Sequence, residues 1–184
     1  MNRAVFLDRD GVLNRVILRA GKPHPPDSLD RLELLPGVPQ ACSKLREAGF
    51  LLVMVTNQPD VRRGTQTRGT VEAMNAALQD RLKLDDVRVC YHDDQDRCAC
   101  RKPQPGMITD AARELSIDTA NSFMVGDRDR DMDAGRRAGC RTVFIRNEYA
   151  GFGMVAPDFS TDSLLKAADW IATAKERFVK ETIA

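Results

Sequence analysis

Short apolar, β-branched segments alternate along this chain with longer segments of helical spacing, and this alternation restricts its possible folds more than any other feature. Strands are predicted at 4–7, 51–55, 87–90, 123–125 and 142–145. Helices are predicted between them at 38–48, about 70–84, 106–115 and 132–138. The alternation indicates an α/β fold, a three-layer α/β/α Rossmann-like arrangement with a mostly parallel sheet covered by helices on both faces.

The length of 184 residues predicts a single domain, 1–184, large enough to bury a core. The segment 15–35 has no regular pattern, so we expect a flap there, too short to form a separate cap domain. The segment 147–162 is rich in Gly, Pro and aromatic residues and is predicted to be a loop with one short edge strand. Helical spacing returns from 163 to about 182, which predicts a C-terminal helix.

The charge balance excludes some classes of function. Lys and Arg total 28 against 27 Asp and Glu, a net charge of +1, so binding to nucleic acid or to an anionic membrane is not expected. The longest apolar run, 50–55, is far shorter than the roughly 20 residues of a membrane-spanning helix. Charged residues at 8–10 leave no room for a signal peptide before them, so we expect a cytoplasmic protein. A monomer is a separate expectation.

Polar side chains follow each predicted strand, where ligands bind in parallel sheets. They are Asp8 and Asp10, then Thr56 and Asn57, then His92, then Asp127. The pair Asp8 and Asp10 can share a cation, or divide nucleophilic and acid-base roles, although a solvated turn closed by Gly11 explains it equally well. Asp127 directly follows a strand and is placed for a metal ligand.

The other candidates are ambiguous when each is taken alone. Thr56 can hold a phosphoryl oxygen or simply cap a turn. Arg101 and Lys102 lie before a helix and suit an anionic substrate, but they can equally form a surface basic pair. Asp131 can support the loop after Asp127, whereas Asp129 and Asp133 are typical of an acidic helix N-terminus.

Three cysteines and a histidine form a second cluster, Cys90, His92, Cys98 and Cys100. Their type and number match a tetrahedral zinc site, and four protein ligands leave zinc no open position, so we expect a structural Zn²⁺. It would fix a loop at 90–102 that delivers Arg101 and Lys102. A redox Cys-x-Cys pair with an unrelated histidine is the alternative.

The order of these motifs resembles the haloacid dehalogenase (HAD) superfamily: Asp-x-Asp, Thr, Lys and then Gly-Asp-x₃-Asp. The stretch 8–14, the Thr-Asn-Gln at 56–58, Cys-x-His-x₅-Cys-x-Cys and Arg-Lys-Pro at 101–103 are similar to one branch of it. That branch contains the D-glycero-D-manno-heptose-1,7-bisphosphate 7-phosphatases and their neighbours, the histidinol-phosphate phosphatases.

The resemblance implies a Mg²⁺-dependent phosphomonoesterase with an aspartyl-phosphate intermediate. Asp8 would be the nucleophile and Asp10 the acid and base, with Mg²⁺ held by Asp8, the backbone carbonyl of Asp10 and Asp127. Thr56, Asn57 and Lys102 would bind the transferred phosphoryl group, and Asp131 would support the site. The remaining implied residues contact the rest of a small phosphorylated sugar: Gln58, Arg63, Arg101 and Arg128.

The expected reaction is removal of the C7 phosphate of heptose 1,7-bisphosphate, a step towards the lipopolysaccharide core precursor. A phosphatase for histidinol phosphate, or for another small sugar phosphate, is the nearest alternative. A phospho-accepting receiver-like module is a more distant one, because its acceptor Asp follows a middle strand where this chain has His92. A zinc-stabilised nucleic-acid binder would need a basic face that the net charge does not indicate.

Overall fold

A six-stranded parallel sheet forms the centre of the computed structural model, which describes residues 1–149 and 156–181. The strand order is β5-β4-β1-β6-β7-β8, and every neighbouring pair is parallel. This confirms the predicted α/β class, and β8 is the edge strand expected in 147–162. The strands are β1 (Arg3–Leu7), β4 (Phe50–Asn57), β5 (Asp86–Cys90), β6 (Phe123–Gly126), β7 (Arg141–Ile145) and β8 (Phe159–Thr161).

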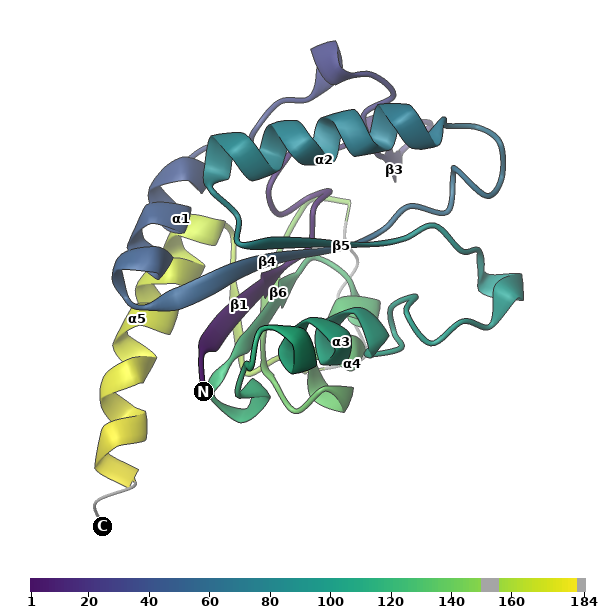
Figure 1. Cartoon of the computed structure of the whole chain (residues 1–184). Helices are drawn as coiled ribbons and strands as arrows, with labels where there is room; N and C mark the ends of the chain where they lie inside the picture. Colours follow the sequence, from purple (N-terminus) through teal and green to yellow (C-terminus); the bar gives the residue numbers. More distant parts are fainter. Residues whose placement is uncertain (150–155, 182–184) are drawn as a thin grey trace.

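Helices cover both faces of this sheet (Figure 1). Helices α1 (Val38–Glu47), α2 (Arg68–Leu82) and α5 (Leu164–Glu181) pack on one face, and α3 (Gly106–Glu114) and α4 (Asp129–Arg137) pack on the other. Both Gly49 and Gly139 follow helix ends with positive φ, as their positions in the sequence predicted. The predicted C-terminal helix runs to Glu181, and its expected end at about 182 lies outside the described residues.

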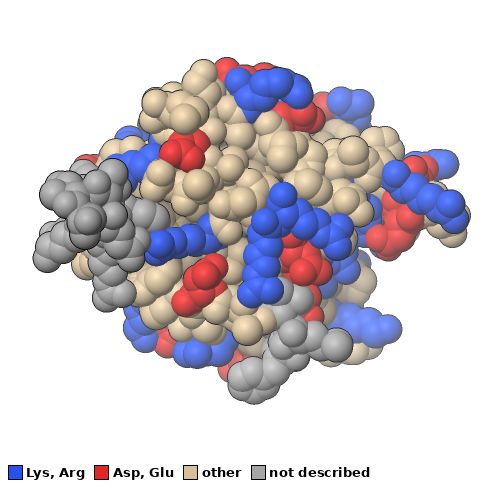
Figure 2. Space-filling model, turned by 90° about the horizontal axis from the view of Figure 1, so that it is seen from below, with Lys and Arg blue, Asp and Glu red and all other residues tan. Residues whose placement is uncertain are grey.

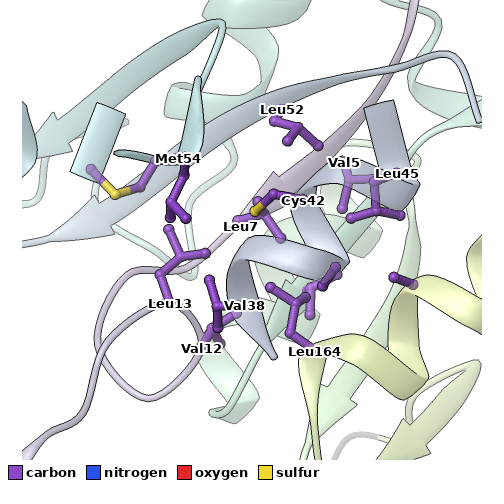
Figure 3. Packing of buried hydrophobic residues seen from close by; sticks show 14 of the residues in the cluster. Val5, Leu7, Val12, Leu13, Val38, Cys42, Leu45, Leu52, Met54 and Leu164 are labelled. Carbon is purple, nitrogen blue, oxygen red and sulfur yellow. The ribbon is translucent and has the colours of Figure 1, made fainter. Parts of the chain in front are cut away.

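The period of two along each strand divides the core into two hydrophobic clusters. Val5 and Leu7 of β1 belong to a cluster with residues of α1, α2 and α5. The close view shows them together with Val38, Cys42 and Leu45 of α1 and Leu164 of α5 (Figure 3). Ala4 and Phe6 point to the opposite face and pack with α3 and α4. The side chains of residues 4–7 are all fully buried, so β1 is covered on both faces and its carboxyl end is held rigidly.

The flap at 15–35 contains more regular structure than its sequence pattern indicates. Strands β2 (Ile17–Arg19) and β3 (Lys22–His24) form an antiparallel hairpin, closed by Ala20 and Gly21 with positive φ. A single 3₁₀ turn follows at Leu29–Arg31. Further 3₁₀ turns lie at Asp94–Asp96 and Thr119–Asn121. The division into one domain with a flap at 15–35 and a zinc loop at 90–102 stays a prediction.

Acidic and basic side chains are interspersed on the face shown in Figure 2, which has no continuous basic surface. Within residues 1–149 and 156–181, no helix has the length and apolar character needed to cross a membrane.

Gly135 of α4 is predicted to be essential for the packing of that helix on the sheet. A Cβ at this position would lie 2.6 Å from Met124 Cβ and 3.0 Å from Thr142 Cγ2. We expect Gly135→Ala to destabilise the protein by about 1–3 kcal/mol through overpacking. In Gly69→Ala, the matched control in α2, a Cβ meets nothing within 4 Å, so stability should be unchanged or rise. Urea unfolding of both variants checks the prediction, and equal stabilities would contradict it.

Candidate active site

Three neighbouring strands of the sheet deliver the central polar residues to one point. Asp8 follows β1, Thr56 lies near the end of β4, and Asp127 follows β6, while the order β4-β1-β6 makes these strand ends adjacent. All three residues are buried. Because the carboxyl ends of parallel strands lie at the same edge of a sheet, residues far apart in sequence meet here.

Lys102 reaches this point from the loop between β5 and α3. Its Nζ lies 2.8 Å from Asp8 Oδ1, 2.8 Å from the Val55 carbonyl and 2.7 Å from Asp131 Oδ1. The ammonium group therefore donates hydrogen bonds to Asp8 and to the Val55 carbonyl and forms an ion pair with Asp131. Burial alone lowers the pKa of Lys102, but Asp131 and Asp8 together raise it, so the side chain stays charged.

A group of three carboxylates beside Lys102 fits a divalent cation. Ligand oxygens of Asp8, Asp127 and Asp131 all lie within 4.8 Å of one another. Asp127 Oδ1 is buried and accepts no hydrogen bond from the residues that the structure describes, which leaves it available to a metal. Oxygen ligands of this kind are those that Mg²⁺ prefers.

Burial raises the pKa of Asp8 to about 6, with Lys102 opposing the shift and Asp131 adding to it. Burial also raises the pKa of Asp127 to about 7, and the charges of Asp8 and Asp131 add to this shift. Three buried carboxylates with one lysine carry an excess of negative charge, which a divalent cation would balance.

The other oxygen of Asp127 is held by residues that sequence reasoning missed. Oδ2 accepts hydrogen bonds from Tyr149 Oη at 3.1 Å and from Asn147 Nδ2 at 3.2 Å. Gly11 lies so close that a Cβ there would be 2.2 Å from Asp127 Oδ2. These contacts fix the orientation of the carboxylate. The sequence offered no signal for them, because 147–149 has no periodicity.

The structure places Gln58 against Asp10 and Thr56. Its Nε2 donates to Asp10 Oδ2 at 2.8 Å and to Thr56 Oγ1 at 2.9 Å. The side chain of Asn57 forms two hydrogen bonds with the backbone of Lys102. Its Nδ2 donates to the Lys102 carbonyl, and its Oδ1 accepts from the Lys102 N–H. Both side chains therefore position other site residues. Their roles towards phosphate and substrate stay predictions.

A cleft of about 270 Å³ opens above Asp8 and Asp10. Its polar wall includes Arg63, Arg101 and Arg128, which were predicted from the sequence. It also includes Arg130, which was not predicted. Residues of the segment 15–35 line another side of the cleft. The flap residues that line it are Val16, Pro23, His24 and Pro25.

The second predicted cluster is also brought together. The Sγ atoms of Cys90, Cys98 and Cys100 lie 3.2–3.7 Å apart, and His92 Nδ1 is 3.3 Å from Cys100 Sγ and 3.6 Å from Cys90 Sγ. Zn–S bonds of about 2.3 Å imply tetrahedral ligand separations of about 3.7 Å, so the four atoms fit a zinc ion. In this geometry the cluster can hold Zn²⁺.

The zinc loop is joined to the cleft by ion pairs. Asp94 Oδ1 accepts from Arg101 Nε at 2.8 Å, and Asp93 Oδ2 accepts from Arg63 Nε at 2.5 Å. The Arg101 N–H also lies 3.4 Å from Cys98 Sγ. These contacts connect the cysteine cluster to the loop that carries Arg101 and Lys102 into the cleft.

Known proteins share this arrangement of sequence and fold. A HAD-hydrolase-like family model matches residues 99–167. The D-glycero-β-D-manno-heptose-1,7-bisphosphate 7-phosphatase of Yersinia pestis is 38% identical over 95% of this chain and 96% of its own. The enzyme of the same name from Photorhabdus laumondii is 42% identical over 78% of this chain and 80% of its own. The chain belongs to the heptose-bisphosphate phosphatase family of HAD-like hydrolases.

Solved structures agree with this family. A D,D-heptose 1,7-bisphosphate phosphatase from B. bronchiseptica, crystallised with magnesium and phosphate, has a TM-score of 0.81 and 31% identity. It covers 94% of this chain and 99% of its own. The corresponding enzyme from Burkholderia thailandensis has a TM-score of 0.63 at 26% identity, covering 92% and 99%. The predicted HAD-like fold and phosphatase class are confirmed at the level of the family.

Proposed function

We propose that this chain removes the C7 phosphate of D-glycero-β-D-manno-heptose 1,7-bisphosphate. The observation that supports this most strongly is the pairing of Asp8 with Lys102 at the base of a cleft whose outer wall is rich in arginine. One phosphate of this substrate can reach Asp8 while the other contacts the arginines of the outer wall. The relatives named above act, by their names, on this bisphosphate.

In the proposed reaction an oxygen of Asp8 attacks phosphorus in line, and the bond to the C7 oxygen breaks. Asp10 gives its proton to the departing alkoxide and becomes a carboxylate. It then takes a proton from the water that attacks the aspartyl-phosphate, which returns Asp8 and releases inorganic phosphate. Lys102 and the hydroxyl of Thr56 are placed to hold the phosphoryl oxygens. Mg²⁺, when bound by Asp8, Asp127 and the carbonyl of Asp10, supplies further positive charge.

The outer arginines are the proposed site of the C1 phosphate. Arg101 and Arg128 lie on opposite loops of the cleft, after β5 and after β6, and both line it. Arginine binds phosphate through two parallel N–H groups, which suits a site that must fix the far end of a substrate. Heptose 7-phosphate, which lacks the second phosphate, should therefore show a raised KM.

A phosphate-release assay tests the function. The panel contains both anomers of heptose 1,7-bisphosphate, heptose 7-phosphate, histidinol phosphate and simple sugar phosphates, each with Mg²⁺ and with EDTA. We expect the β-anomer of the bisphosphate to give the highest kcat/KM and EDTA to stop turnover. A kcat/KM for histidinol phosphate that is higher by orders of magnitude would assign the chain to the alternative substrate.

Three further expectations stay predictions: action as a monomer, a place in the cytoplasm, and a product that serves lipopolysaccharide core precursor synthesis. Size-exclusion chromatography with light scattering tests the first. The expected absence of nucleic-acid binding is tested by a shift assay with DNA and RNA.

The raised pKa values of Asp8 and Asp127 predict how Mg²⁺ stabilises the protein. A folded pKa above the ordinary 3.8 means that the native state binds protons that the unfolded state releases. The stability from these groups is therefore present at low pH and lost as pH rises through about 6–7. Since Mg²⁺ needs the carboxylates ionised, it should raise Tm more at about pH 8 than at about pH 5.5. Equal shifts at both pH values, or a shift that survives in Asp127→Asn, would contradict this assignment.

A further inference from the structure

Arg9, which lies between the two catalytic aspartates, has a side chain that is completely buried. A buried guanidinium is costly unless its charge is paired and its N–H groups are bonded. Its Nε lies 3.1 Å from Asp10 Oδ2, and its Nη2 lies 3.2 Å from Asp10 Oδ1. The fork therefore contacts both oxygens of the acid-base residue and fixes the plane of that carboxylate.

A residue of helix α2 binds the remaining nitrogen of the guanidinium, Nη1. Arg9 Nη1 donates to Asn75 Oδ1 at 3.0 Å. Asn75 is 4% exposed and lies on the buried face of α2 with Met74 and Leu78, a position where an apolar residue is expected. Its Nδ2 has no hydrogen-bond partner among the described residues. A buried amide with one unpaired end destabilises the fold. The hydrogen bond to Arg9 therefore explains why a polar residue stands at this buried position.

The same carboxylate has two further donors. Asn14 Nδ2 donates to Asp10 Oδ1 at 3.0 Å, and Gln58 Nε2 donates to Asp10 Oδ2. All four of these contacts come from donors, and two of them come from the positively charged guanidinium of Arg9. Together these contacts fix both oxygens of the Asp10 carboxylate in one orientation.

We propose that Arg9, locked in place by Asn75, is a positioning residue that holds Asp10 as an oriented carboxylate for hydrolysis of the aspartyl-phosphate. This inference rests on the proposed phosphatase function. In that half-reaction a water oxygen attacks phosphorus, Asp10 takes the water proton, and the bond from phosphorus to Asp8 breaks. Loss of the fork frees the carboxylate to rotate, and a displacement of about 1 Å in such a step can lower the rate up to about 100-fold.

Arg9→Lys keeps the positive charge but removes the guanidinium that contacts both oxygens of Asp10. Asn75→Leu removes the hydrogen bond that holds Arg9 and leaves an apolar residue on the buried face of the helix. Leu78→Met, a volume-conserving change on the same face of α2, is the matched control. p-Nitrophenyl phosphate is the probe, because its leaving group departs without help from an acid. Rapid mixing follows nitrophenolate, acid quenching measures the phosphoenzyme, and Tm reports folding.

We expect kcat to fall about 10- to 100-fold in Arg9→Lys and Asn75→Leu, with KM falling in parallel so that kcat/KM is unchanged. A burst of up to one nitrophenolate per active site and accumulated phosphoenzyme should appear in these variants, while Leu78→Met behaves as wild type. Asn75→Leu keeps the test valid if Arg9→Lys does not fold.

Kinetics unchanged from wild type, or kcat and kcat/KM falling together without a burst, would overturn the role of Arg9. A wild-type protein that releases neither nitrophenolate from the aryl ester nor phosphate from heptose bisphosphate in the presence of Mg²⁺ would instead overturn the proposed function, so the two failures are distinguishable.

Discussion

Replacing Asp8 with Asn is expected to abolish turnover, by about 10⁴-fold or more, and to leave the fold intact. The amide has no anionic oxygen to attack phosphorus, so no aspartyl-phosphate can form. The amide oxygen can still accept from Lys102 Nζ, which keeps its contacts with Val55 and Asp131. Because burial raises the pKa of Asp8 to about 6, its charge destabilises the metal-free protein above that pH, and removing it should not lower Tm there.

The measurement is phosphate release from heptose bisphosphate and nitrophenolate release from the aryl ester, with Tm recorded on the same samples. Asp110→Asn, a surface carboxylate on α3, is the control and should keep full activity. Retention of even a tenth of wild-type activity in Asp8→Asn would exclude the covalent mechanism proposed for this site.

The sequence predicted those parts of the site that depend on strand ends. Asp8, Thr56 and Asp127 each follow or end an apolar strand, and parallel strands present their carboxyl ends at one edge, so their meeting could be expected. The cysteine cluster could be predicted for a different reason. Its ligands are close in sequence, and metal-ligand spacing is a local property.

The contacts that depend on tertiary packing could not be derived from local patterns. Nothing near Arg9 in the sequence indicates that its partner is Asn75, 66 positions away on α2. The role of Tyr149 and Asn147 against Asp127 likewise depends on where a loop after β7 returns to the site. Asn75 itself breaks the apolar pattern of its helix face, and such a local exception was the one available signal.

The hairpin in the flap has a sequence signal that hydrophobic periodicity did not reveal. Its two strands have three residues each, too short for a period to emerge, yet Ala20-Gly21 between them is a two-residue turn with positive φ at both positions. Such turns are typical of tight hairpins. The hairpin brings His24 to the cleft, a placement that the composition of 15–35 did not indicate.

Removal of zinc is expected to destabilise the protein strongly and to inactivate it even when Mg²⁺ is in excess. Cys90 ends β5 while Cys98 and Cys100 precede Lys102, so the metal would join the sheet to the loop that positions Lys102. Loss of a structural metal is among the few changes that cost on the order of 4 kcal/mol or more. For a chain of this size that corresponds to a fall in Tm of about 8–16 °C.

The experiment uses a zinc-selective chelator with Mg²⁺ held in excess, followed by melting, activity and metal analysis, and then by addition of Zn²⁺. Cys98→Ser should reproduce the effect and lose bound zinc. Cys140→Ala, a buried cysteine outside the cluster, should keep its zinc and its activity. Because Lys102 contacts Asp8 directly, a loosened loop must lower kcat as well as Tm. The opposite result is a protein that holds no zinc when purified without added metal, and whose Tm and activity the chelator does not change. That result would favour the redox interpretation of the cysteine pair.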